Sequence, residues 1–162
     1  MPSVPLHKDE DLQGLLIPQR QIPLLLPVST VIEILGYREI VASDTEAGWL
    51  LGSFSWRNLT LPLISMERLL GVAREETRSR GRKRIIVVHV FSDRLKAPFV
   101  GIEATGMPRM VKLNEENLAA VEDEAWPGDW PVSHKVKVQE TEALVPDLDR
   151  LGELVADLRI GS

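Results

Sequence analysis

Short apolar runs recur along the chain, and proline, glycine or charged residues separate them. Runs of this kind are typical of strands joined by turns and loops. The stretches that predict strands are residues 12–18, 21–27, 37–42, the two halves of 49–64, 85–91, 99–105, 107–113, 135–138 and 142–145. The pattern therefore predicts a mainly β protein that is rich in barrel structure, with only a few short helices.

Two connections in this pattern have specific backbone requirements. The first two runs are close enough in sequence to predict an antiparallel pair of strands. Because proline has no N–H to donate, Pro18, Pro23 and Pro27 are expected where those strands start, end or run along an exposed edge. A tight turn is expected at Arg57 and Asn58, since asparagine tolerates positive φ better than most residues.

Four helices are predicted from capping residues and apolar spacing. Thr30 and Glu33 have the spacing of a capping box, which predicts a helix ending at Gly36. Ser65 is expected to cap a second helix. The predicted helices are residues 29–35, 66–70, 114–121 and the stretch behind Asp147, whose residues Leu148, Leu151, Leu154, Val155 and Leu158 share one helical face.

Length and composition predict one globular domain. The 162 residues are 44% hydrophobic and contain no cysteine, so we expect a single domain over residues 11–160, a disordered leader at 1–10 and an exposed charged loop at 72–84. No apolar stretch approaches the ~20 residues that a membrane-spanning helix needs, and the N-terminus lacks a signal-peptide core. A cytoplasmic protein without membrane insertion is therefore expected.

Residues that could support catalysis or hold a cofactor form no recognisable motif. The absence of cysteine excludes thiol catalysis and thiolate metal sites, and the three histidines are far apart with no metal-ligand spacing. The glycines form no phosphate-binding loop, and Ser53 lacks the second glycine of a nucleophile elbow. The sequence therefore predicts no enzyme, no cofactor and no metal, although 24 acidic residues leave a small barrel enzyme with an acidic site as one rival.

A basic segment provides the other rival interpretation. The net charge of -5 argues against a protein that coats nucleic acid. A local cluster could still bind phosphates, but no aromatic residue interleaves with it to stack on bases. The alternative function is thus a small β-barrel nucleic-acid-binding module that uses Arg74, Arg78, Arg80, Arg82, Lys83 and Arg84. Trp126 and Trp130 lie in a Pro/Gly-rich loop, which they either pin to the barrel or expose for interaction.

Motifs over residues 31–71 resemble those of the CheW-like domain of bacterial chemosensory systems. They are Val31-Ile32-Glu33-Ile34, Trp49-Leu50-Leu51-Gly52, Ser55-Trp56-Arg57-Asn58, Leu61-Pro62-Leu63-Ile64-Ser65 and Leu69-Leu70-Gly71. Ser55 and Asn58 depart from the Asn and Gly of the family's turn. Within the family, the Ser-Trp-Arg turn, the Pro-Asp-Leu-Asp segment and the charged loop are most similar to ChpC-type adaptors, which serve systems controlling type IV pili.

The resemblance implies a fold of two intertwined five-stranded SH3-like β-barrels and a non-catalytic adaptor or scaffold function. The implied partners are the regulatory domain of a CheA-type histidine kinase and the cytoplasmic tip of a methyl-accepting chemoreceptor, with no nucleic acid. By motif position, the resemblance implies that Val31, Glu33 and Arg57 contact the receptor. Each has a simpler interpretation as well: Val31 as a core residue, Glu33 as part of a capping box and Arg57 as a solubilising residue at a turn.

Overall fold

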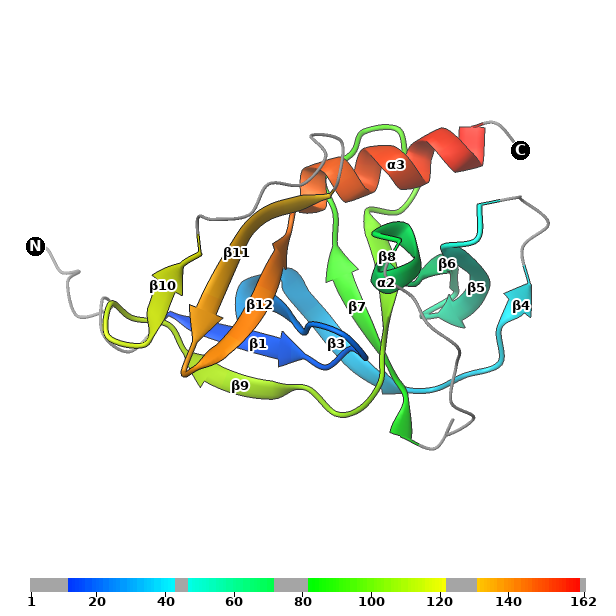
Figure 1. The fold of residues 1–162 in the computed structure, drawn as a ribbon. Coiled ribbons are helices and arrows are strands. Elements are labelled where there is room, and N and C mark those ends of the chain that lie inside the picture. Colours follow the sequence, from blue (N-terminus) through cyan, green and yellow to red (C-terminus); the bar gives the residue numbers. More distant parts are fainter. Residues whose placement is uncertain (1–11, 43–46, 72–81, 122–130, 161–162) are drawn as a thin grey trace, which may run out of the picture.

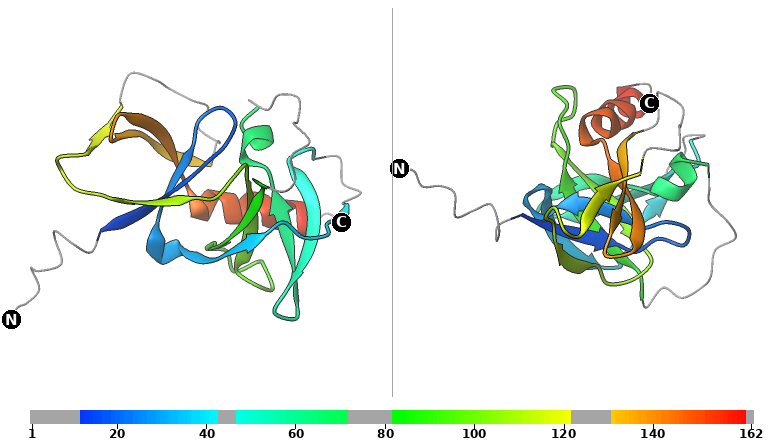
Figure 2. Two further views of the ribbon diagram at one scale, coloured as in Figure 1. Left: turned by 90° about the horizontal axis from the view of Figure 1, so that it is seen from below. Right: turned by 60° about the vertical axis from the view of Figure 1, so that its left-hand side comes forward.

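Two six-stranded sheets make up most of the computed structural model, which describes residues 12–42, 47–71, 82–121 and 131–160. Sheet A contains, in spatial order, β10 (Leu118–Ala120), β11 (Val132–Val138), β12 (Thr141–Pro146), β2 (Leu24–Pro27), β1 (Gln13–Ile17) and β9 (Arg109–Lys112). Sheet B contains β3 (Val31–Gly36), β7 (Arg84–His89), β8 (Phe99–Ala104), β6 (Leu59–Ile64), β5 (Leu50–Trp56) and β4 (Val41–Ala42). The left view of Figure 2 separates the orange and yellow strands of sheet A from the green and cyan strands of sheet B.

The chain crosses between the sheets twice. Strands β1 and β2 belong to sheet A, β3 to β8 to sheet B, and β9 to β12 return to sheet A beside β2, which β12 joins in parallel. The mainly β class with two interleaved sheets and few helices is thus confirmed. Each sheet has one strand more than the five implied by the resemblance, and the shortest edge strands are β4, with two residues, and β10, with three.

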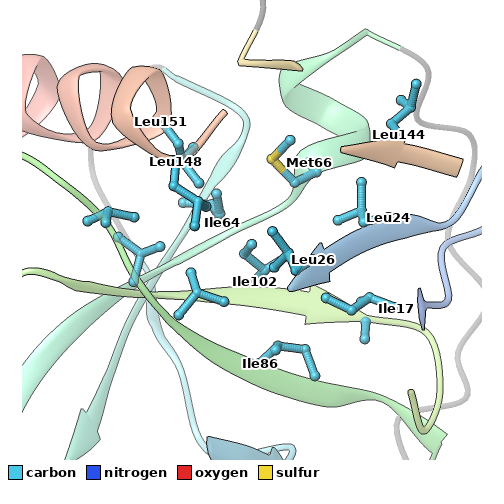
Figure 3. Close-up of a cluster of buried hydrophobic side chains, with 14 of the residues drawn as sticks. Ile17, Leu24, Leu26, Ile64, Met66, Ile86, Ile102, Leu144, Leu148 and Leu151 are labelled. Atoms are coloured by element: carbon cyan, nitrogen blue, oxygen red, sulfur yellow. The ribbon is translucent and has the colours of Figure 1, made fainter. Parts of the chain in front are cut away.

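A shared apolar core lies between the sheets and the helices (Figure 3). Its members come from both sheets, from α2 (Met66–Leu69) and from α3 (Leu148–Ile160). The labelled residues of this core are Ile17, Leu24, Leu26, Ile64, Met66, Ile86, Ile102, Leu144, Leu148 and Leu151. Because side chains alternate along a strand, the intervening residues point to the opposite face of each sheet and form a second, smaller core there. Leu25 belongs to this inner core of sheet A, and Ile85 and Val87 belong to that of sheet B. Both faces of each sheet are therefore largely apolar.

Several predicted elements are confirmed. Strands β1 and β2 pair antiparallel, with Pro18 and Pro23 just outside them and Pro27 at the end of β2. Arg57 and Asn58 form the turn between β5 and β6. In α2 the hydroxyl of Ser65 accepts a hydrogen bond from the amide of Arg68 at 3.3 Å, as expected of a capping residue. The predicted strand at 37–42 is reduced to β4.

The predicted helix at 29–35 is wrong. A 3-10 turn, Val28–Thr30, is followed by strand β3, which pairs with β7. The Thr30 hydroxyl donates to the carbonyl of Pro27 at 2.8 Å instead of capping a helix. Three β-branched residues at 31, 32 and 34 favour the strand, because their stiff side chains pack well on a pleated surface. Partnership with β7 thus overrides the local capping signal.

The predicted helix at 114–121 is also wrong. The Asn114 side chain accepts hydrogen bonds from the amides of Glu116 at 2.9 Å and Asn117 at 3.0 Å. This side chain therefore stabilises a single turn, after which β10 pairs with β11. The stretch behind Asp147 does form a helix, α3, as predicted.

Three sequence predictions lie wholly or mostly outside the described residues: the leader at 1–10, residues 72–81 of the basic loop, and the loop with Trp126 and Trp130. Within the described part of the chain, the helices are too short or too polar to cross a membrane.

Candidate functional site

A two-residue turn presents Arg57 at the tip of the β5–β6 hairpin. Trp56 and Leu59 are the last paired residues of the two strands, and Arg57 and Asn58 between them have φ of 48° and 66°. Two successive positive φ values define the type I′ turn, whose twist suits a two-residue hairpin. Asn58 tolerates this conformation well, so the turn survives without the glycine of the family motif.

Glu33 on β3 lies against this hairpin tip. One carboxylate oxygen, Oε1, accepts hydrogen bonds from the indole Nε1 of Trp56 at 2.9 Å and from Nη2 of Arg57 at 3.0 Å. The guanidinium carbon of Arg57 lies 4.4 Å from the centre of the Trp56 ring, within the range of a cation–π contact. These three residues are called the Glu33 cluster below. In this cluster, strand β3 and the tip of the β5–β6 hairpin hold the Glu33 carboxylate and the Arg57 guanidinium together.

Burial differs sharply within the Glu33 cluster. Trp56 is 4% exposed, belongs to the inner core of sheet B and meets Phe99 edge to face at 5.3 Å. The side chains of Arg57 and Glu33 are 63% and 39% exposed. The indole therefore anchors the cluster in the core, while the ion pair remains accessible to a partner.

The electrostatics of the cluster keep Glu33 ionised. The indole hydrogen bond from Trp56 is the largest cause that lowers the pKa of Glu33, and the charge and hydrogen bond of Arg57 lower that pKa further. Partial burial opposes them, and the charge of Arg38 adds a smaller lowering effect. At neutral pH the cluster is therefore a carboxylate paired with a guanidinium.

Two isoleucines flank Glu33 in the sequence of β3, and Ile34 lies on the opposite face of sheet B from Glu33, because Glu33 pairs with Val87 and Ile34 with Ile86. Ile32 and Ile34 are each 37% exposed, although large aliphatic side chains are usually buried. Val31 behaves differently, because it is partly buried and packs against the shared core. The strand register shifts between Val31 and Glu33, which pair with successive residues of β7.

The structure thus brings together two of the three residues implied by the resemblance, Glu33 and Arg57. Sequence reasoning missed the hydrogen bond from Trp56 to Glu33 and the exposure of the two isoleucines. A signal was present for Trp56, because a tryptophan directly before a tight turn needs a partner for its N–H when it is buried. Among the residues that the structure describes, no three metal-ligating side chains gather at this cluster or elsewhere.

Comparison with known proteins gives one family match and a match to a solved structure. The model of the CheW-like domain family matches residues 13–155. The crystal structure of the scaffolding protein TtCheW from Thermoanaerobacter tengcongensis superposes with a TM-score of 0.73, covers 93% of each chain and is 13% identical in sequence. That structural similarity shows a shared fold. No curated protein matches the sequence. Because the family model spans most of the chain, this protein belongs to the CheW-like domain family.

Proposed function

We propose that this protein is a non-catalytic cytoplasmic adaptor that couples a chemoreceptor to a CheA-type histidine kinase. Membership of the CheW-like family supports the adaptor class. The observation that carries the assignment of a binding surface is the Glu33 cluster, in which an accessible ion pair is anchored to the core through Trp56.

The proposed receptor-binding surface is centred on the Arg57–Glu33 pair and extends around the edge strand β3, which also exposes Ile32 and Ile34. Apolar side chains that become buried in an interface contribute most of its affinity, and charged groups set orientation and reject unsuitable partners. Because Glu33 already has two donors, the charged pair needs little rearrangement before binding. Val31 supports the surface from the core side in this proposal, since it packs inward on the same strand.

The partners we propose are the cytoplasmic tip of a methyl-accepting chemoreceptor for this surface and the regulatory domain of the kinase for another face. Resemblance to ChpC-type adaptors supports type IV pilus control as the output. A strain that lacks this protein is then expected to lose regulated twitching motility and to keep flagellar swimming.

Arg57→Glu provides the direct test of the receptor-binding surface. It places a second carboxylate beside Glu33, so we expect loss of co-purification with a receptor fragment. The thermal midpoint should change little, because an exposed ion pair contributes little to stability. Lys112→Glu on β9 makes the same charge change at another exposed cation and is expected to leave receptor binding intact. Receptor binding of Arg57→Glu at wild-type strength would show that the turn is not the contact.

A further inference from the structure

A second surface lies on a different part of sheet B, where the loop between β7 and β8 rises beside α3 (Figures 1 and 2). The loop and the helix line an open groove of about 850 Å³. Its walls include His89, Phe91, Asp93 and Arg94 from the loop side, and Asp149 and Glu153 from the helix. The groove contains no residue of the Glu33 cluster. It is called the α3 groove below.

The walls of the α3 groove are held together by packing and by charge. A Cβ atom at Gly152 would lie 3.3 Å from the carbonyl oxygen of Phe91, so the helix and the loop are in close contact there. Nη2 of Arg94 donates to the carboxylate of Glu153, and to Asp157 at 2.8 Å. These bonds raise the pKa of Arg94, with the Asp157 hydrogen bond as the largest cause. The loop is thereby fastened to α3.

An exposed aromatic ring lies along the groove. Phe91 is 52% exposed, whereas most aromatic side chains are largely buried. It meets His89 edge to face at 4.8 Å, His89 meets Phe99 at 5.7 Å, and Phe99 meets Trp56 at 5.3 Å. This row of rings supports Phe91 from the core, so its free side is a supported apolar surface.

The available charge of the groove is negative. Asp93 on the loop and Asp149 on the helix are exposed, and neither carboxylate has a hydrogen bond or ion pair within the described residues. The two guanidiniums that line the groove do not neutralise these carboxylates. Arg94 already pairs with Glu153 and Asp157, and Arg150 also has a partner. A remaining carboxylate, Asp147, accepts from the first turn of α3 at 3.1 Å.

We propose that the α3 groove docks a segment of a partner protein that carries an apolar side chain next to a lysine or arginine. The apolar side chain would pack on Phe91, and the cation would lie between Asp93 and Asp149 on opposite walls. Aromatic residues in a supported setting are common anchors of interfaces, and complementary charge fixes the direction of a bound segment. The open shape of the groove suits a short segment bound transiently.

The test uses the full chain, labelled with 15N, and two peptides of equal length that differ in charge. One alternates leucine with lysine and the other leucine with glutamate. The lysine peptide is expected to shift the amide signals of the β7–β8 loop and of the first turns of α3, and the glutamate peptide is not. Shifts confined to other surfaces, or equal shifts with both peptides, would overturn the proposal.

Four variants separate specific docking from attraction between opposite net charges. Phe91→Ala should weaken binding of the lysine peptide about tenfold, and Asp149→Asn by a few fold. Met110→Ala is the apolar control, because Met110 is 55% exposed on β9, and Glu115→Gln is the acidic control on an exposed turn. Equal effects of the test and control variants would contradict a specific site. Arg57→Glu should leave peptide binding unchanged, so the result is independent of the receptor surface.

Discussion

Gly101→Ala is expected to destabilise the protein through overpacking in the inner core of sheet B. Gly101 lies on β8, between Val87 of β7 and Leu63 of β6. A Cβ atom at this position would lie 2.6 Å from Cε1 and 2.8 Å from Cζ of Phe54, and 2.9 Å from Cγ2 of Ile85. Carbon atoms normally pack about 3.5–4.0 Å apart, so the Phe54 ring has to retreat by roughly 1 Å.

The magnitude follows from the lack of free space. Phe54 is 2% exposed and Ile85 is fully buried, so neither side chain can move into solvent. Inserting a methyl group into a packed core costs about 1–3 kcal/mol. For a chain of this length, each kcal/mol lowers the thermal midpoint by about 2–4 °C, so we expect a decrease of roughly 2–12 °C.

Circular dichroism melts of matched variants provide the assay. Gly36→Ala on β3 is the control, because a Cβ atom there meets nothing within 4 Å, and its midpoint should stay within about 2 °C of the wild type. Combining Gly101→Ala with Phe54→Leu should cost less than the sum of the two single changes, since the smaller side chain makes room. A midpoint for Gly101→Ala equal to that of the control would refute the overpacking argument.

The remaining predictions concern the Glu33 cluster and α3. Because the native pKa of Glu33 lies below its ordinary value of 4.5, its stabilising contribution is complete above that value and is lost as the pH falls through the native pKa. A carboxyl 13C NMR titration of Glu33 should therefore give a pKa below 4.5, and Trp56→Phe should raise that pKa by removing the indole hydrogen bond. A pKa at or above 4.5 in the wild type would contradict the assigned hydrogen bonds. Asp147→Ala should lower the free energy of unfolding in urea by about 1 kcal/mol by removing the cap of α3, whereas Asp147→Asn should retain most of it. Equal losses for the two variants would exclude the capping role.

Local signals predicted the elements whose geometry depends on near neighbours. The turn at Arg57 and Asn58 forms because its backbone requirement is met within the hairpin itself. The cap at Ser65 likewise involves a residue three positions away. The same kind of signal failed at Glu33, whose side chain bonds to residues 23 and 24 positions further along instead of to its own backbone. Capping spacing is therefore informative only where no sheet competes for the segment.

The candidate site was predicted in part. Resemblance of motifs indicated Glu33 and Arg57, which the fold brings within 3.0 Å of each other, but it gave no reason for their proximity. The resemblance implies the same contact for Val31, which is partly buried and packs against the shared core, and its role in binding stays a prediction. Exposure of Ile32 and Ile34 depends on the position of β3 as an edge strand of sheet B, and no spacing rule reveals which strand lies at an edge.

By itself, the sequence determined the mainly β class, most strand positions, the hairpin turn and the C-terminal helix, because alternation and turn chemistry act over a few residues. Only the tertiary structure decided which strands pair and therefore which distant side chains meet. Two ion pairs illustrate the difference: Glu33 with Arg57, and Arg94 with Glu153. Both join segments separated by many residues, so the Glu33 cluster and the walls of the α3 groove form only after the two sheets and α3 have packed on their shared core.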